Sequence, residues 1–451
     1  MKNKKHFLSL LFIIILFINA FSILYSINYN KKDESTVNDK LLIAASDPVN
    51  LIWNRTWFDY QYAGGNAIGL DSINNTYITG YTGSVVNSLE ACLVKYDSSG
   101  QFQWDRTWGI LGTMDADFGQ AIRISSTGDI YVLGYTEEWL GFGYGDRDVF
   151  LLKYNSTGDL QWYDVWGGSG YDMCYEIAID NNNNIFLGGY TESWNAEGYA
   201  MCLLKYNTSG ALEWNRTWGE GFFTGAMGIV VDSSNNIYLG GKIGPDMCLV
   251  KFDNFGVWQW NRSWNTLRNV YCRGITIDSS DDIYLVGEGL IFIDNSTGFG
   301  IETSLLKYNK FGELQWSHIW NTTTGSTTRY LINGISLDSS NNIYLAKRTI
   351  DDNMELEKFD SSGNKEWDYV FGSTGTDSCN GIVIDTGNNI YMTGRLDSNM
   401  YVAKFIENPP ETPEPGIPGY NLWMLICVLS VVSSVIAFSI SLKLKLSKKI
   451  E

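Results

Sequence analysis

The sequence predicts an all-β fold, a seven-bladed β-propeller of four-stranded blades closed by an N-terminal outer strand. Three observations lead to this prediction: a Trp motif and a hairpin motif each recur along the chain, and the first copy of the Trp motif lacks the rest of its unit. Short strands repeating at such a period are typical of propellers, whereas a β-sandwich has no such repeat. We therefore expect residues 50–406 to form one closed domain.

The Trp motif, Trp-x3-Trp, ends a strand–turn–strand segment, of which LLKYNSTGDLQWYDVW at 151–166 is a clear copy. An LxKY strand is followed by a turn of Asn, Ser, Asp and Gly and then by the strand with the aromatic pair, which is the pattern of a tight hairpin. The tryptophans of the motif are Trp53, Trp57, Trp104, Trp108, Trp162, Trp166, Trp214, Trp218, Trp260, Trp264, Trp316, Trp320 and Trp367. In the seventh copy Phe371 takes the second position.

The hairpin motif supplies the other two strands of each unit. It has a β-branched run, a turn such as DSSNN and a second apolar run, as in GIVVDSSNNIYLGG. Its seven copies lie at 67–80, 121–134, 176–189, 228–241, 274–287, 334–346 and 381–394. One hairpin of each kind makes a four-stranded blade, so the copies predict seven blades.

The incomplete units at the two ends of the repeat predict how the ring closes. LIWNRTW at 51–57 is an outer strand without a blade, and the last unit, 379–406, lacks its outer strand. Pairing the two would remove both exposed sheet edges. We expect Trp53 and Trp57 to lie beside the strand near 401–405.

With these motifs, the chain resembles the seven-bladed β-propeller (SBBP-type) repeat proteins of bacterial and archaeal surfaces, over about 51–406. The turn in KYNSTGDLQW also resembles the Trp-docking motif of quinoprotein propellers. The first resemblance implies a cell-surface propeller. The second implies that the Trp pairs lock neighbouring blades together, which agrees with the burial of many large aromatic side chains.

The two ends of the chain predict a membrane anchor and an extracellular propeller. Residues 1–27 read as a signal peptide or signal anchor, 28–49 as a linker and 407–419 as a Pro-rich stalk. Residues 420–442 are long and apolar enough for a transmembrane helix. The basic tail 443–451 marks the cytoplasmic side, so the membrane is the expected partner through one C-terminal helix.

Charge and histidine content limit the possible functions. The net charge of −18 argues against nucleic acid as a partner. The only histidines are His6 and His318, which leaves little for a Ser-His-Asp, Cys-His or His-metal site. A non-enzymatic module for ligand binding, adhesion or envelope scaffolding is therefore favoured. An extracellular enzyme, either quinoprotein-like or carbohydrate-active through paired carboxylates, remains the alternative.

The turns of the hairpin motif are rich in the oxygen ligands that calcium prefers. The better candidates for a Ca²⁺ site are Asp180, Asn182 and Asn184 in one turn and Asp278 and Asp282 in another. Asp and Asn are also the residues that tight turns need, so turn formation is the simpler explanation. No other cofactor is expected.

Eight Asn-x-Ser/Thr sequons are consistent with a glycoprotein, although repeats rich in Asn, Ser and Thr also produce such sequons by chance. Six cysteines fall into two positions of the repeat. Only Cys174 and Cys202 share a blade. Their strands are separated by another, or about 9–10 Å, which is too far for a disulfide. We expect the cysteines to be small buried residues.

The connections on one face differ widely in length and sequence, for example 136–148, 191–200 and 289–304. Variable loops on a rigid scaffold commonly carry recognition. The candidate ligand-binding residues combine aromatic and polar side chains suited to a glycan or a surface protein. They are Asp115, Asp117, Trp139, Tyr144, Asp146, Arg147 and Trp194.

Overall fold

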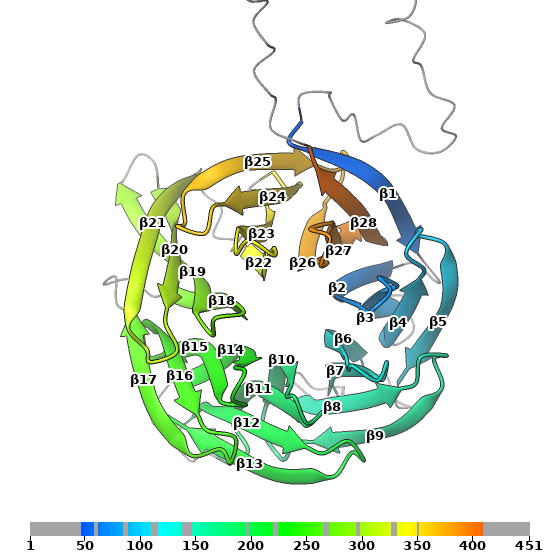
Figure 1. The fold of residues 1–451 in the computed structure, drawn as a ribbon, viewed down its shortest axis with the longest axis vertical. Coiled ribbons are helices and arrows are strands. Elements are labelled where there is room, and N and C mark those ends of the chain that lie inside the picture. The colour runs from blue at the N-terminus through cyan, green and yellow to red at the C-terminus, as the bar shows by residue number, and fades with distance from the viewer. Residues whose placement is uncertain are drawn as a thin grey trace, which may run out of the picture. The chain divides into compact units, whose positions relative to one another are not determined.

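The computed structural model confirms the seven-bladed β-propeller (Figure 1). It describes residues 47–57, 62–83, 89–109, 116–137, 147–194, 198–219, 224–264, 270–294, 298–325, 332–349 and 351–408. The expected signal segment, transmembrane helix and basic tail lie outside these ranges, as do nearly all of the linker and stalk. Within the described ranges, no helix is long and apolar enough to cross a membrane.

Twenty-eight strands form seven antiparallel sheets of four. Blade 1 contains β2 (Tyr62–Leu70), β3 (Thr76–Gly83), β4 (Leu89–Tyr96) and β5 (Phe102–Trp108). Blade 2 contains β6 (Ala116–Ile124), β7 (Ile130–Glu137), β8 (Arg147–Tyr154) and β9 (Leu160–Trp166). Blade 3 contains β10 (Asp172–Ile179), β11 (Ile185–Thr191), β12 (Ala200–Tyr206) and β13 (Leu212–Trp218).

Blade 4 contains β14 (Thr224–Val231), β15 (Ile237–Ile243), β16 (Asp246–Phe252) and β17 (Trp258–Trp264). Blade 5 contains β18 (Val270–Ile277), β19 (Ile283–Asp294), β20 (Gly298–Tyr308) and β21 (Leu314–Gly325). Blade 6 contains β22 (Ile332–Leu337), β23 (Ile343–Arg348), β24 (Met354–Phe359) and β25 (Lys365–Phe371). Blade 7 contains β26 (Ser378–Ile384), β27 (Ile390–Leu396), β28 (Asn399–Glu407) and β1 (Val49–Trp57).

The N-terminal strand β1 completes blade 7. It runs antiparallel to β28, with Trp53 opposite Lys404 and Trp57 opposite Met400. Val49 lies opposite Glu407, so the chain enters and leaves the propeller at the same point. The unpaired Trp motif at the N-terminus is therefore the missing outer strand of the last blade.

The hydrophobic core lies between the blades. Each cluster of buried residues draws on two neighbouring sheets, because a four-stranded blade packs both of its faces against others. At the closure, Trp53 of β1 joins Ile68 and Val94 of blade 1 to Tyr391 and Val402 of blade 7. Closing the ring therefore extends the core around the whole propeller.

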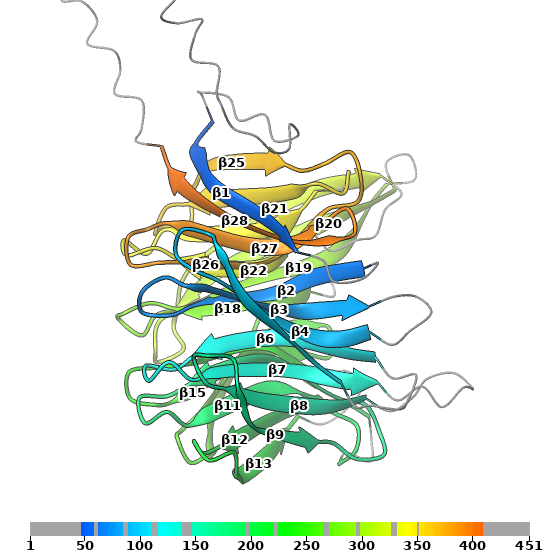
Figure 2. The ribbon, with the colours of Figure 1, turned by 90° about the vertical axis from the view of Figure 1, so that its right-hand side faces the viewer.

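The two faces of the propeller differ in the length of their connections (Figure 2). On the turn face, every link between first and second strands or between third and fourth strands has five residues, as in 71–75 and 97–101. On the loop face, the links range from two residues, 244–245, to nine, 138–146. Variation is therefore confined to the loop face. Because Val49 and Glu407 lie at the turn-face ends of β1 and β28, both ends of the described chain leave from the turn face.

The turns between first and second strands need a residue with a left-handed backbone at their fourth position. Asn74, Asn183, Asn235 and Asn388 occupy it with φ of 61° to 64°. Asn and Asp adopt this conformation more readily than other residues with side chains, and glycine adopts it freely. Blade 2 accordingly has Gly128 there, at φ 84°. The DSSNN sequences are thus explained by turn geometry.

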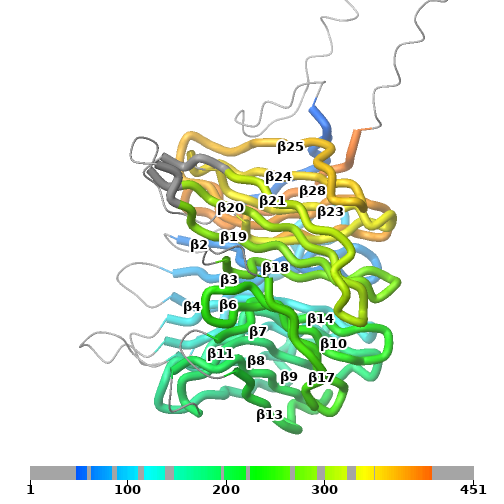
Figure 3. The backbone as a smooth tube through the Cα atoms, turned by 90° about the vertical axis from the view of Figure 1, so that its left-hand side faces the viewer, coloured from blue at the N-terminus to red at the C-terminus, as the bar shows by residue number. Residues whose placement is uncertain are grey.

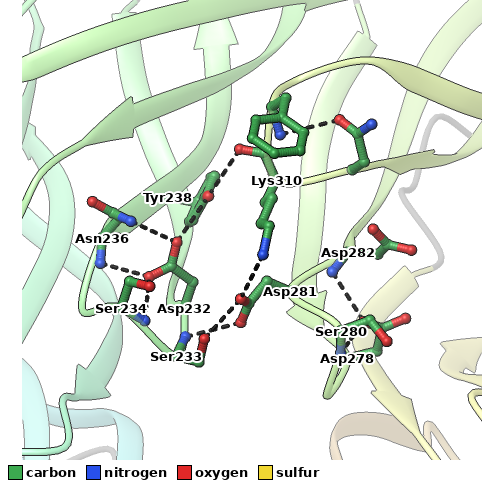
Figure 4. Close-up of polar contacts among 12 residues, drawn as sticks. Asp232, Ser233, Ser234, Asn236, Tyr238, Asp278, Ser280, Asp281, Asp282 and Lys310 are labelled. Atoms are coloured by element: carbon green, nitrogen blue, oxygen red, sulfur yellow. Dashed lines mark hydrogen bonds and ion pairs between the residues drawn. The ribbon is translucent and has the colours of Figure 1, made fainter.

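The same turns join neighbouring blades on the turn face. Figure 4 shows the contact between blades 4 and 5, where Asp281 accepts hydrogen bonds from the backbone nitrogen and Oγ of Ser233 at 2.9 and 2.7 Å. Lys310 lies 3.7 Å from the same carboxylate. Burial alone would raise the pKa of Asp281, but the Ser233 hydrogen bonds and Lys310 outweigh it and lower the pKa. The carboxylate stays charged and links the two blades.

A β-bulge interrupts each inner strand at the same place, so that one extra residue faces the propeller axis. The bulged residues are Asn66, Gln120, Tyr175, Met227, Arg273, Asn333 and Asn380, and all line a central cavity of about 660 Å³. Asn66 and Asn380 each donate through Nδ2 to a backbone carbonyl of the next inner strand, at 2.9 and 2.8 Å. The first bond joins blades 1 and 2, and the second joins blades 7 and 1 across the closure.

Cys174 and Cys202 are free and buried, as expected, but their side chains approach more closely than the spacing of their strands suggests. Their Sγ atoms are 3.8 Å apart because both residues flank Gly189, whose missing side chain lets the thiols approach over the middle strand. All six cysteines within the described ranges are free and buried. Burial raises the pKa of the Cys174 thiol, so it remains neutral.

The stretch 289–304, expected to be a loop, is largely the tip of a long hairpin. β19 and β20 have 12 and 11 residues and stay paired beyond Gly289 (Figure 3). Ile291 and Ile301 are both buried, so each of the two lengthened strands keeps an apolar side chain in the packed part of the hairpin. Blade 5 therefore projects further on the loop face than the repeat predicts.

Candidate ligand-binding face

The predicted binding residues separate into three groups. Asp115, Trp139, Tyr144 and Asp146 lie outside the described residues. Asp117 is buried, with 2% exposure, whereas Arg147 is half-buried and Trp194 is 52% exposed. The structure brings Arg147 together with aromatic residues that the sequence analysis did not select.

One position of the repeat divides the loop face into an aromatic and a charged half. It follows the small residue of the second strand, at the end of the IYLxG motif. Blades 1 to 3 have tyrosine there, and blades 4 to 7 have charged residues. In chain order these are Tyr81, Tyr135, Tyr190, Lys242, Glu288, Lys347 and Arg395.

The aromatic half begins at the junction of blades 1 and 2. Tyr81 contacts Phe118 edge-on, with ring centroids 5.4 Å apart. Phe118 stacks on Tyr135, its partner across β6 and β7, at 5.1 Å. All three rings are half-buried, so they form a continuous aromatic surface that solvent can reach.

Arg147, the first residue of β8, lies between Tyr135 and Tyr171. Its guanidinium is 5.3 Å from the ring centroid of Tyr135 and 5.9 Å from that of Tyr171. Glu137, directly opposite in β7, accepts a hydrogen bond from Arg147 at 3.2 Å. Burial alone would lower the pKa of Arg147, but the hydrogen bond and charge of Glu137 raise it, so the guanidinium stays charged.

Blade 3 extends the aromatic surface. The ring centroids of Tyr175 and Tyr190 are 6.0 Å apart, and Tyr199 meets Tyr190 edge-on at 5.0 Å. The Tyr190 hydroxyl lies 3.2 Å from Sδ of Met173. Burial raises the pKa of Tyr175, so its hydroxyl stays protonated and able to donate a hydrogen bond. We call Tyr81, Phe118, Tyr135, Arg147, Tyr171, Tyr175, Tyr190 and Tyr199 the loop-face aromatic cluster.

Trp194 belongs to the next loop and covers Trp166, with ring centroids 4.6 Å apart. Ser193 fixes this loop by donating to Oδ2 of Asp172 at 2.6 Å. Asp172 also accepts from the backbone nitrogen of Gly168 at 2.8 Å. One face of Trp194 is therefore held in place while the other remains exposed.

Asp117 holds the same repeat position as Asp172 and Asp377. These three buried carboxylates begin the inner strands of blades 2, 3 and 7. Asp377 accepts hydrogen bonds from Ser373 Oγ at 3.0 Å and from the backbone nitrogen of Asp397 at 2.9 Å. Asp172 and Asp377 thus brace the connections on the loop face, and Asp117 lies beneath that face. Ligand binding by Asp117 stays a prediction.

The two candidate calcium turns use their oxygens inside the turn. Asp180 Oδ1 accepts from the backbone nitrogens of Asn182 and Asn184, both at 2.8 Å, and Oδ2 accepts from Asn184 Nδ2 at 2.8 Å. Asp278 and Asp282 lie 3.5 and 3.0 Å from Lys307 Nζ. The described residues contain no group of three or more His, Cys, Asp or Glu side chains placed to hold a metal. Calcium binding stays a prediction.

The tryptophans of the Trp motif lie away from the loop-face aromatic cluster, where neighbouring blades meet. A Cβ built on Gly210, in a turn of blade 3, would lie 2.6 Å from the Trp162 ring of blade 2. Arg106 donates through Nε to the Gly158 carbonyl of the next blade at 2.7 Å. The second tryptophan of the motif packs on the next blade in the same way. In blade 1, the ring centroids of Trp108 and Phe150 are 4.4 Å apart.

At the closure Glu407 replaces the missing turn. It accepts from Nε1 of Trp367 at 2.8 Å and pairs with Lys358 at 2.7 Å. The last residue of β28 therefore gives blade 6 the partner that a complete blade 7 turn would supply.

The sequence carries a signal for the loop-face aromatic cluster. Its tyrosines follow the glycine of the hairpin motif in three successive units, Gly-Tyr at 80–81, 134–135 and 189–190. When the repeat units are aligned, these tyrosines share one position at the end of the second strand. That position indicates a binding surface only if it is known to lie on the loop face.

Comparison with known proteins supports the repeat assignment. Residues 165–194 match the SBBP family, described as a beta-propeller repeat. Regulatory protein FlaEY of Caulobacter vibrioides is 26% identical over 114 residues, which are 23% of this chain and 12% of that protein. WD repeat-containing protein L264 of Acanthamoeba polyphaga mimivirus is 22% identical over 122 residues, 22% of this chain and 9% of that protein. The chain thus matches only a small part of either relative.

Solved structures resemble the chain at low sequence identity. The extracellular domain of a hybrid two-component system from B. thetaiotaomicron aligns with a TM-score of 0.45 and 15% identity, covering 79% of this chain and 39% of that one. A protein of unknown function from Dyadobacter fermentans aligns with a TM-score of 0.47 and 8% identity, covering 80% of this chain and 100% of that one.

Proposed function

We propose that this seven-bladed propeller of SBBP-type repeats is a membrane-anchored, extracellular ligand-binding module whose loop face recognises neutral carbohydrate. The observation that carries the proposal is the loop-face aromatic cluster, in which half-buried tyrosines surround the Arg147–Glu137 pair. Binding at this face would serve adhesion, envelope scaffolding or capture of surface polysaccharide.

The chemistry of the cluster suits sugar rings. The apolar faces of a pyranose pack on aromatic rings, while its hydroxyl groups need nearby donors and acceptors. Tyr135 and Tyr190 supply exposed ring area, and Arg147 and Glu137 supply charged hydrogen-bonding groups that cancel in net charge. With the −18 charge of the chain, this balance favours neutral over acidic polysaccharides.

The position of the chain ends supports display on a surface. Val49 and Glu407 lie together at the turn face, on the opposite side of the propeller from the cluster. A stalk at 407–419 and a membrane helix at 420–442 would therefore direct the loop face away from the membrane. Protease treatment of intact cells tests this topology: an extracellular propeller is digested, and a protected one would contradict the proposal.

Binding to a panel of neutral oligosaccharides, measured by titration calorimetry, tests the site. We expect Tyr135→Ala and Tyr190→Ala each to weaken binding about 10-fold or more, taking for the sugar ring the scale of about 1 to 3 kcal/mol that a nucleic-acid base gains by stacking on an aromatic side chain. Phe255→Ala is the matched control, because Phe255 is 70% exposed on the turn face. Equal losses in all three variants would place binding elsewhere and overturn the proposal.

A further inference from the structure

The third strand of each blade ends in a five-residue segment whose last two residues are Lys-Tyr or Lys-Phe, as in CLVKY at 92–96. The side chains at the first and third positions of this segment face the preceding blade. In six blades neither residue is charged, and both are buried. The pairs are Cys92 and Val94, Phe150 and Leu152, Cys202 and Leu204, Cys248 and Val250, Ser304 and Leu306, and Tyr401 and Ala403.

Blade 6 breaks this rule with two carboxylates. Glu355 and Glu357 take the two positions and face the outer strand of blade 5. Glu357 is 3% exposed, and the side chain of Glu355 is 15% exposed. Replacing apolar core residues by buried carboxylates is costly, so this interface is built differently from the other six.

Two lysines accompany the carboxylates. Lys347, 6% exposed, lies 3.4 Å from Glu355 and 3.0 Å from Glu357. Lys365 lies 2.8 Å from Glu357 and occupies a position that is apolar in blades 1 to 5, where Phe102 is an example. Glu355, Glu357 and Lys365 therefore depart from the repeat together, and Lys347 stands at a position that is charged in blades 4 to 7.

These residues line a cavity of about 660 Å³ between blades 5 and 6. Its apolar lining comprises Ile319 and Trp320 of blade 5 and Phe359 of blade 6, and the rings of Trp320 and Phe359 stack with centroids 5.3 Å apart. A purely structural ion-pair network would need no such space, because protein interiors are close-packed. The cavity, the charges and the apolar wall together describe a small-molecule site.

The charges in the cavity are unequally satisfied. Glu357 has two lysine partners, at 3.0 and 2.8 Å, whereas Glu355 pairs with Lys347 at 3.4 Å and interacts with Lys365 only at longer range. Burial raises the pKa of Glu355, and Glu357 nearby raises it further against the opposing effects of Lys347 and Lys365. A further cation beside Glu355 would stabilise the charged form of this buried carboxyl and lower its pKa. Lys365 also pairs with Asp368 at 3.0 Å, and because its side chain is 43% exposed, its ammonium group can still be reached by an anionic group from solvent.

We propose that the cavity between blades 5 and 6 binds a small zwitterion with an apolar side chain, either a free α-amino acid or the equivalent groups of a peptide. Its ammonium group pairs with Glu355, its carboxylate with Lys365, and its side chain packs on Trp320 and Phe359. This site is separate from the loop-face aromatic cluster and does not depend on the proposed carbohydrate binding.

Titration calorimetry of the full chain with four probes tests the proposal. L-phenylalanine and L-leucine are expected to bind. N-acetyl-L-phenylalanine, which lacks the ammonium group, and phenethylamine, which lacks the carboxylate, are each expected to bind at least 10-fold more weakly than L-phenylalanine. Failure of both amino acids to bind, or equal binding of all the phenylalanine analogues, overturns the proposal.

Variants locate the site. Glu355→Gln preserves size and is expected to weaken L-phenylalanine binding at least 10-fold while the melting temperature shows that the protein remains folded. Glu313→Gln, on an exposed turn, is the matched control and leaves binding unchanged. Tyr135→Ala in the loop-face aromatic cluster also leaves it unchanged. Unaltered binding in Glu355→Gln would refute the assignment, as would equal losses in Glu355→Gln and Tyr135→Ala.

Discussion

Replacing Trp53 by alanine tests how the ring is closed. Trp53 is 8% exposed and contacts Tyr391 edge-on at 6.1 Å, and a Cβ built on Gly100 of blade 1 would lie 2.6 Å from its ring. The Arg55 guanidinium lies 5.9 Å from its centroid. Truncating a buried tryptophan typically costs about 3–5 kcal/mol, and an exposed cation–π contact adds about 0.5–1. We expect Trp53→Ala to lower the free energy of unfolding by about 3–5 kcal/mol.

Trp258→Ala provides the control for this experiment. It removes the same atoms from an outer strand, but Trp258 is 47% exposed, so we expect a loss below about 1 kcal/mol. Urea unfolding followed by far-UV circular dichroism measures both variants without depending on tryptophan fluorescence. Equal losses, or a loss below about 1 kcal/mol for Trp53→Ala, would refute the closure by β1.

Three further substitutions test the packing between blades and the buried charges. Gly210→Ala should destabilise the protein more than Gly128→Ala, because both glycines have φ near +85° but only a Cβ at Gly210 would meet Trp162, at 2.6 Å; equal melting temperatures would contradict this. Glu407→Gln should cost about 1–2 kcal/mol in urea unfolding, because Lys358 and the Trp367 Nε1 group then lose a charged partner; an unchanged midpoint would count against its role at the closure. Because its pKa is raised, Glu355 contributes stability that is present below the pKa of the unfolded state and is lost as pH rises through the pKa of the folded state. Glu355→Gln should therefore flatten the pH dependence of the melting temperature in that window, and an unchanged profile would exclude the effect.

The fold could be read from the sequence because repetition tests each assignment several times. The hairpin motif and the Trp motif fix four strands per unit, and the spare strand at 51–57 matches the gap in the last blade. Turn chemistry was equally readable, since a left-handed position such as that of Asn235 demands Asn, Asp or Gly.

The candidate sites were less predictable because they depend on which side chains meet across blades. Arg147 was selected from the sequence, but its neighbour Tyr171 comes from blade 3. Glu355 and Glu357 stand in a segment that otherwise reads as an ordinary repeat copy. Their significance depends on knowing that these positions face the core. The approach of Cys174 to Cys202 likewise depends on the absent side chain of Gly189.

Hydrogen exchange with and without a bound neutral oligosaccharide tests the recognition face most directly. The account predicts slower exchange on the loop face, in peptides that cover 131–137, 171–175 and 190–194, which contain Tyr135, Tyr175 and Tyr190. It predicts no change in the turn-face segments 180–184 and 232–236. Protection confined to the turn face, or to the outer strands, would contradict carbohydrate recognition by the loop-face aromatic cluster.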